Sequence, residues 1–136
     1  MIHNVALVLG GGGAAGNAWE IGIIAGLAEA GLDMTEAADL VVGTSAGATA
    51  AAQMLSGIRA AELLAAVLSP PVQPAGQNRE RLPRPEWPDK PMIIVAIDAH
   101  TGELAAFDRD SGVDLVDAVT ASTALPGLVP TVSINP

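Results

Sequence analysis

The sequence has no cysteine, few basic residues and almost no aromatic side chains. Without cysteine the chain forms no disulfide, no cysteine-ligated zinc site and no thiol nucleophile. Six basic against fifteen acidic residues give a formal net charge of −9, which disfavours non-specific nucleic-acid binding, because that needs a basic surface. Apolar residues are abundant instead: they make up 50% of the 136 residues, which excludes a disordered chain. The length indicates one domain, residues 1–136.

Long uncharged apolar runs are also lacking. Glu20, Arg59 and Glu62 interrupt the most apolar stretches, so that none reaches the ~18 residues of a membrane span. The residues before the first apolar run include no Lys or Arg, so that a secretory signal is not indicated. We therefore expect a cytoplasmic protein, and contact with a membrane surface stays open as a peripheral interaction.

Short aliphatic runs alternate with longer helical patterns, which is typical of an α/β fold. Strands are predicted at 5–9, 38–42, 92–98, 103–107 and 129–134, and helices at 15–30, 46–55, 58–68 and 111–123. This order predicts a mostly parallel sheet with helices on both faces. Residues 69–91 hold seven of the ten prolines and are predicted to form a linker or surface excursion, or to mark a gap region.

Two helices carry more specific signals. In the first, Trp19, Ile23 and Leu27 are four residues apart and therefore share one face. In the last, Ser111 and Asp114 fit a capping box, with Ser111 as the N-cap.

A glycine cluster at residues 10–16 separates the first predicted strand from the first helix. Glycines permit positive φ and close approach, and free N–H groups at a helix start attract negative charge. The cluster contains G-x-G-x-x-G, which suits a dinucleotide loop, but it also suits an oxyanion hole. A dinucleotide site needs an acidic residue at the carboxyl end of the second strand, whereas Asp33 and Asp39 both precede that strand. A turn without a ligand is the third interpretation, opposed by the entropy cost of four successive glycines.

Residues 43–47 read Gly-Thr-Ser-Ala-Gly, which is G-x-S-x-G at a predicted strand-to-helix junction. This is the context of a nucleophile elbow, in which Gly43 and Gly47 leave room for a sharp turn that projects the Ser45 hydroxyl. A right-handed crossover would bring the glycine loop and Ser45 to the same edge of the sheet. Acyl transfer needs hydrogen-bond donors for the oxyanion and a hydroxyl as nucleophile, which the loop N–H groups and Ser45 would supply together. The alternative is that Ser45 only caps the following helix.

Three blocks, at residues 10–22, 43–48 and 121–130, together resemble the patatin-like phospholipase family, and the hairpin at 98–107 is similar as well. The resemblance implies a three-layer α/β/α sandwich and a serine acyl hydrolase with a Ser–Asp dyad and no histidine. Ser45 would be the nucleophile. Gly16 would belong to the family's glycine-loop motif, and Gly43 and Gly47 to its G-x-S-x-G motif.

The oxyanion hole implied by the resemblance consists of backbone N–H groups around Gly11, Gly12 and Gly13. Substrates in such a family are phospholipids, lysophospholipids, neutral lipids and simple carboxylic esters, in part at membrane surfaces. No cofactor is implied, most members require no metal, and neither a dinucleotide nor a nucleic acid is an expected partner. The resemblance leaves the oligomeric state open.

The catalytic aspartate of the family lies in an Asp-Gly-Gly or Asp-Gly-Ala motif after the third block, and no Asp-Gly dipeptide occurs here. We therefore expect the Asp base beyond Pro136, which makes the chain incomplete; the alternative is a catalytically inactive relative that keeps the pocket. Asp98 and His100 suggest a Ser–Asp–His triad, but His100 falls in a predicted turn at 99–102. His3 precedes the first strand, at the opposite edge of the sheet. The other acidic side chains near the last helix are explained as caps or solvated faces: Asp108, Asp110, Asp114 and Asp117.

Overall fold

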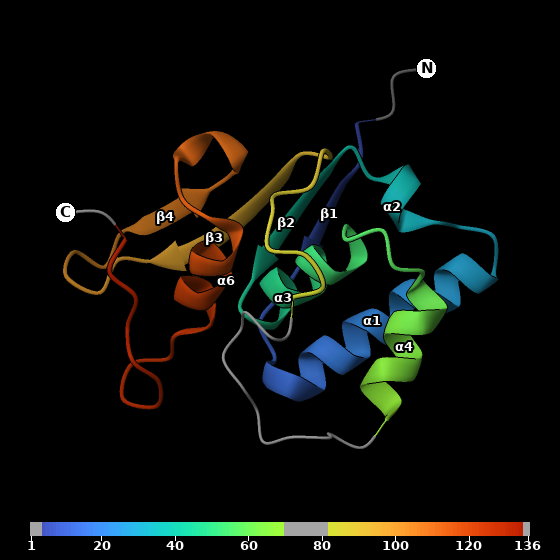
Figure 1. Cartoon of the computed structure of the whole chain (residues 1–136), viewed down its shortest axis with the longest axis horizontal. Coiled ribbons are helices and arrows are strands. Elements are labelled where there is room, and N and C mark those ends of the chain that lie inside the picture. The colour runs from blue at the N-terminus through green and yellow to red at the C-terminus, as the bar shows by residue number, and fades with distance from the viewer. Residues whose placement is uncertain (1–3, 70–81, 135–136) are drawn as a thin grey trace.

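The computed structural model describes residues 4–69 and 82–134. Four strands form one sheet in the order β1-β2-β3-β4 (Figure 1). Their bounds are Ala6–Leu9 for β1, Leu40–Thr44 for β2, Met92–Ile97 for β3 and Leu104–Phe107 for β4. The first three strands are parallel, and β4 returns antiparallel to β3. The predicted α/β class with a mostly parallel sheet is therefore confirmed.

Helices connect the parallel strands β1, β2 and β3, as the sequence predicts, and a further helix follows β4. They are α1 (Gly13–Glu29), α2 (Met34–Ala37), α3 (Ala46–Met54), α4 (Ala60–Leu68) and α6 (Leu115–Thr123), with a short 3-10 helix η1 (Arg109–Ser111). The α3 helix lies over β1 and β2, α6 lies over β3 beside α3, and α1 packs between α3 and α4 (Figure 1). Neither α2 nor η1 was predicted; α2 is a single turn in which the Asp33 carboxylate accepts a hydrogen bond from the Thr35 N–H.

The core lies between the sheet and α3. In this core the start of α3 packs closely against the end of β2. Small side chains allow this close packing, because Ala48, Ala50 and Ala51 are completely buried on α3. A β-carbon on Gly43 of β2 would lie 2.7 Å from the Ala48 Cα, which is closer than any real contact. The largest fully buried side chains complete this core: Ile21, Ile94, Leu115, Val41 and Val119.

Exposed apolar side chains remain on several surfaces of the described residues, among them one face of the sheet and one face of α1. Val8, Ile97 and Leu104 are exposed by 69%, 63% and 66%, and the strand register places them on the sheet face opposite Val41. On α1, Trp19 and Ile23 share a face, as their spacing predicts, and this face is exposed. The buried residues of α1 are instead Glu20, Ile21, Ile24 and Ala25.

The predicted capping box is wrong. The α6 helix begins at Leu115, with Asp114 as an N-cap whose side chain makes no capping hydrogen bond. Ser111 ends η1, and its hydroxyl donates to the Asp108 carbonyl at 2.6 Å. The reason is Gly112, whose φ of 74° is left-handed and interrupts the helix between the two predicted capping residues.

The predicted strand at 129–134 is also wrong, since those residues contain no strand in the structure. A turn forms first: the N–H groups of Leu128 and Val129 both donate to the Leu125 carbonyl, and Gly127 has a φ of 82°. Pro130 then lacks the N–H that a sheet ladder requires. Within the predicted linker, residues 82–91 form no helix or strand, while 70–81, like His3, lie outside the described residues.

Candidate active site

Ser45 occupies a sharp turn between β2 and α3. Its φ of 54° makes it the one non-glycine residue with positive φ in the described parts of the chain. Such a conformation costs about 1–3 kcal/mol and persists only where the surroundings enforce it. The enforcing contacts are visible: a β-carbon on Gly43 would lie 2.6 Å from the Gly47 carbonyl oxygen, and one on Gly47 would collide with the Leu9 carbonyl. The predicted strand–turn–helix geometry is present, and the catalytic role of Ser45 stays a prediction.

The glycine loop that follows β1 lies directly against this turn. A β-carbon on Gly11 would lie 3.6 Å from the Ser45 Cβ, and one on Gly16 would lie 3.5 Å from the Ala46 Cβ. The Gly47 N–H donates to the Gly10 carbonyl at 2.9 Å. The structure thus brings together the two glycine motifs that the sequence separates by about thirty residues.

Three backbone donors in the loop have no acceptor in the part of the chain that the structure describes. The N–H groups of Gly11, Gly12 and Gly13 have no hydrogen-bond acceptor among the described residues, and all three glycines are exposed. Gly12 is the N-cap of α1 and Gly13 is its first residue, so these N–H groups lie at the helix start, where the helix dipole adds partial positive charge. A group with negative charge held beside Ser45 could therefore accept hydrogen bonds from this loop.

Ser122 connects the third motif to the same turn. The Ser45 N–H donates to the Ser122 Oγ at 2.8 Å, and the Ser122 hydroxyl donates to the Val95 carbonyl at 2.6 Å. Val95 is the residue of β3 that pairs with Thr44, immediately before Ser45. Sequence reasoning gave Ser122 no role of its own; its position within the block at 121–130 was the available signal.

Glu20 was also missed, because in the sequence it only interrupts an apolar run. Its side chain is 6% exposed, and its Oε2 atom has no hydrogen-bond partner among the described residues. Burial raises the pKa of the Glu20 carboxyl, while a hydrogen bond from the Gly10 backbone N–H opposes that rise. Gly10 is therefore linked to α1 through its N–H and to α3 through its carbonyl, which accepts from Gly47.

No described residue forms a hydrogen bond to the Ser45 hydroxyl, so a triad with His100 is not assembled there. The Asp98 carboxylate closes its own turn instead, accepting from the N–H groups of His100 at 2.7 Å and Thr101 at 3.0 Å. These hydrogen bonds lower the pKa of the Asp98 carboxyl, and the one from Thr101 has the largest effect. His100 is exposed on the turn. Of the acidic residues further on, Asp108 caps η1.

The two carboxylates considered for a dinucleotide site, Asp33 and Asp39, have structural partners. Asp39 accepts from the Val5 N–H at 2.7 Å. Asp33 caps α2, and the hydrogen bond from the Thr35 hydroxyl is the main cause that lowers the pKa of its carboxyl. Both precede β2, whereas Ser45 follows it, so neither lies at the carboxyl end of that strand.

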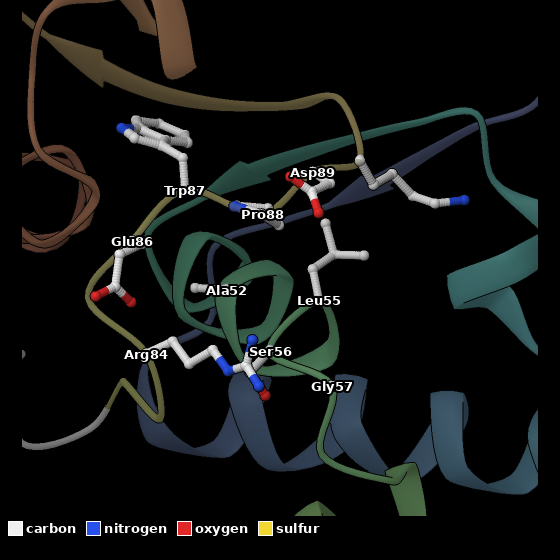
Figure 2. Close-up of a pocket in the computed structure, with 10 residues that line it drawn as sticks. Ala52, Leu55, Ser56, Gly57, Arg84, Glu86, Trp87, Pro88 and Asp89 are labelled. Atoms are coloured by element: carbon white, nitrogen blue, oxygen red, sulfur yellow. The ribbon is translucent and has the colours of Figure 1, made fainter.

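A cleft of about 510 Å³ opens elsewhere, between the end of α3 and the segment before β3. Figure 2 shows Arg84 reaching across it toward Ser56, with Trp87 on the far side. Neither Ser45 nor the glycine loop lines this cleft. Trp87 is held in place, because its indole N–H donates to the Val113 carbonyl at 2.8 Å. The cleft is therefore separate from the Ser45 site.

The described residues contain no group of three or more His, Asp or Glu side chains arranged to hold a metal ion. None of the helices that the structure describes is long and apolar enough to cross a membrane.

The fold and the site together define an α/β protein in which a serine at a strand–turn–helix junction faces a glycine-rich loop. The sequence model of the patatin-like phospholipases matches residues 7–76, just over half of the chain, and includes both the loop and Ser45. The chain belongs to the patatin-like phospholipase family, a family of lipid acyl hydrolases. A search of curated proteins found no match.

Proposed function

We propose that this protein is a serine acyl hydrolase acting on lipid or simple carboxylic esters, with Ser45 as the nucleophile. One observation carries the proposal: Gly11 lies against Ser45, next to backbone N–H groups that have no acceptor in the described residues. A serine held only as a helix cap would not need this loop, and the Ser45 side chain makes no capping hydrogen bond.

The reaction has two steps. The Ser45 Oγ attacks the ester carbonyl carbon, and the carbonyl oxygen becomes an oxyanion that accepts hydrogen bonds from the loop N–H groups of Gly11, Gly12 and Gly13. Breakdown of the tetrahedral intermediate releases the alcohol and leaves an acyl group on Ser45, which water then hydrolyses. Each well-aligned oxyanion donor contributes roughly 100- to 1,000-fold to kcat.

The base in this proposal is an aspartate beyond Pro136, as the family resemblance implies. It accepts the Ser45 proton during attack and returns it to the leaving alcohol, so that protons balance over acyl transfer. The surroundings of Ser45 support this assignment in one respect: within the described ranges, no carboxylate or imidazole contacts its hydroxyl through a hydrogen bond. In this proposal, the partner of the hydroxyl is that aspartate.

A fluorophosphonate probe tests the proposal, because it forms a covalent bond only with an activated serine. The full-length protein should be labelled on the peptide that contains Ser45, and the Ser45→Ala variant should not be labelled. Ser69→Ala is the matched control, since Ser69 is an exposed serine at the end of α4. Absence of labelling in the unsubstituted protein would contradict the proposal.

The same lack of a hydrogen-bond partner for the Ser45 hydroxyl supports a second candidate, an inactive patatin-like domain that binds lipid without hydrolysing it. Hydrolysis of p-nitrophenyl butyrate by the full-length protein, lost in Ser45→Ala, would rule this candidate out. Binding of a long-chain ester without turnover by the full-length protein would favour it over the hydrolase.

A further inference from the structure

We propose that Ser122 is a positioning residue that fixes the backbone of the nucleophile and withdraws the Ser45 N–H from the oxyanion site. The inference rests on the proposed function and assigns a task to a residue outside both glycine motifs. Its hydroxyl both accepts from the Ser45 N–H at 2.8 Å and donates to the Val95 carbonyl at 2.6 Å.

The behaviour of neighbouring hydroxyls on α6 sets Ser122 apart. Thr120 and Thr123 donate to carbonyls one turn back in their own helix, at Val116 and Val119. Hydroxyls in helices commonly bond in this local manner. Ser122 instead bonds to two groups that are 27 and 77 residues away in the sequence. It therefore joins α6, β3 and the Ser45 turn through one oxygen.

The Ser45 turn needs such a partner. Its positive φ is a strained conformation that persists only when the surrounding contacts determine it. The glycine contacts of Gly43 and Gly47 act on the flanks of the turn, whereas the Ser122 hydroxyl acts on Ser45 itself. Removing the hydroxyl leaves the Ser45 N–H and one lone pair of the Val95 carbonyl without this partner, so the turn can relax and move the nucleophile relative to Gly11.

The hydrogen bond has a second consequence for the oxyanion. An N–H that donates to Ser122 is not available to a substrate, so the nucleophile's own amide does not contribute to the oxyanion hole. The donors are then restricted to the loop at Gly11, Gly12 and Gly13, whose N–H groups have no acceptor in the described residues. Ser122 thus orients the serine and leaves charge stabilisation to the loop.

Two readouts test this inference in the full-length protein. The first is the hydrogen-exchange rate of the Ser45 amide, measured by NMR, which does not depend on hydrolysis. The second is the rate of fluorophosphonate labelling, with kcat and KM for p-nitrophenyl butyrate. In Ser122→Ala we expect at least tenfold faster exchange of the Ser45 amide. Labelling and kcat should fall roughly 100-fold with little change in KM, because a misplacement of about 1 Å costs that much.

Ser122→Thr keeps the hydroxyl and should recover labelling to within tenfold of the unsubstituted protein. Thr120→Val removes a hydroxyl that bonds only within α6 and should change neither readout. Labelling of Ser122→Ala within twofold of the unsubstituted rate would overturn the inference. If Ser122→Ala does not fold, the hydrogen-exchange rate of the Ser45 amide in the unsubstituted protein still tests the inference. Exchange as fast as that of the exposed Gly12 amide overturns the inference, and protection from exchange supports it.

The two proposals fail in different ways. A protein whose Ser45 is never labelled, while its amide is protected through Ser122, contradicts the hydrolase and retains the positioning contact. A protein that is labelled equally with and without the Ser122 hydroxyl contradicts the positioning role alone.

Discussion

The backbone N–H of Ser45 donates to the hydroxyl oxygen of Ser122 at 2.8 Å, across 77 residues of sequence. This hydrogen bond ties the turn after β2 to the helix α6, and the Val95 carbonyl completes the link to β3. The serine in the first half of the chain is therefore held by a residue from the second half. The block at 121–130 consequently acts on the site even though it contributes no group to the glycine loop.

Gly11→Ala tests the closeness of the glycine loop to the nucleophile. The new methyl would lie 3.6 Å from the Ser45 Cβ, an ordinary contact that the fold can accept. It would nevertheless occupy space beside the attacking oxygen, where the tetrahedral intermediate forms. We expect kcat/KM for p-nitrophenyl butyrate to fall at least tenfold with an unchanged thermal midpoint. Full activity in this variant would mean that the substrate does not approach Ser45 past Gly11.

Gly43→Ala tests the packing of α3 on β2. Its β-carbon would lie 2.6 Å from the Gly47 carbonyl oxygen and 2.7 Å from the Ala48 Cα, and backbone atoms cannot move aside cheaply. We expect the free energy of unfolding to fall by about 1–3 kcal/mol or more, as overpacking does. Urea denaturation followed by circular dichroism measures it.

The matched control is Gly26→Ala in α1, where an added β-carbon meets nothing within 4 Å. Because alanine loses less backbone entropy than glycine on forming a helix, this variant should gain about 0.5–1 kcal/mol. A Gly43→Ala variant as stable as Gly26→Ala would show that the two elements are less tightly packed than described.

Glu20→Gln tests the buried carboxyl behind the glycine loop. Burial raises the pKa of Glu20 above its ordinary value of 4.5, so the folded protein holds the proton more tightly than the unfolded chain does. The stability that comes from the protonated carboxyl is complete below pH 4.5 and is lost as the pH rises through the folded pKa. We therefore expect the free energy of unfolding of Glu20→Gln, relative to that of the unsubstituted protein, to increase as the pH rises from 4.5 through the folded pKa of Glu20. Below pH 4.5 and well above the folded pKa, this difference should not depend on pH.

Urea titrations from pH 4 to pH 8 measure this difference, with the exposed Glu29→Gln as a matched loss of one charge from α1. A difference between the Glu20→Gln and unsubstituted proteins that stays constant over the whole range would contradict a raised pKa for Glu20.

His100→Ala separates the proposed dyad from a triad. His100 is exposed on the turn between β3 and β4, and the carboxylate of Asp98 accepts from its backbone N–H, which alanine keeps. We expect hydrolysis within twofold of the unsubstituted rate. A loss of 100-fold or more would instead show that His100 acts as the base.

The sequence predicted much of what positions the site, because those features follow from local patterns and from a general rule of strand connection. Short aliphatic runs ending in glycine predicted β1 and β2, and the right-handed crossover rule predicted that Gly11 and Ser45 meet at one sheet edge. The sharp turn at Ser45 was predicted from Gly43 and Gly47, whereas its positive φ was not.

Features that depend on tertiary contacts were not predicted. Ser122 is one of several hydroxyl residues on α6, and only the packing of α6 on β3 brings its oxygen to Ser45. Glu20 was treated as a break in an apolar pattern, whereas it is buried behind the loop. The capping box at Ser111 and the strand at 129–134 were wrong because Gly112 and the turn at Gly127 override the local patterns.

The most direct test of the central claim, that Ser45 is an activated nucleophile, is the stoichiometry of fluorophosphonate labelling of the full-length protein, measured by intact mass and peptide mapping. The account predicts one adduct per chain, located on Ser45, absent from Ser45→Ala and unchanged in Ser69→Ala. A protein that remains unlabelled, or that carries its adduct on another residue, would contradict the account.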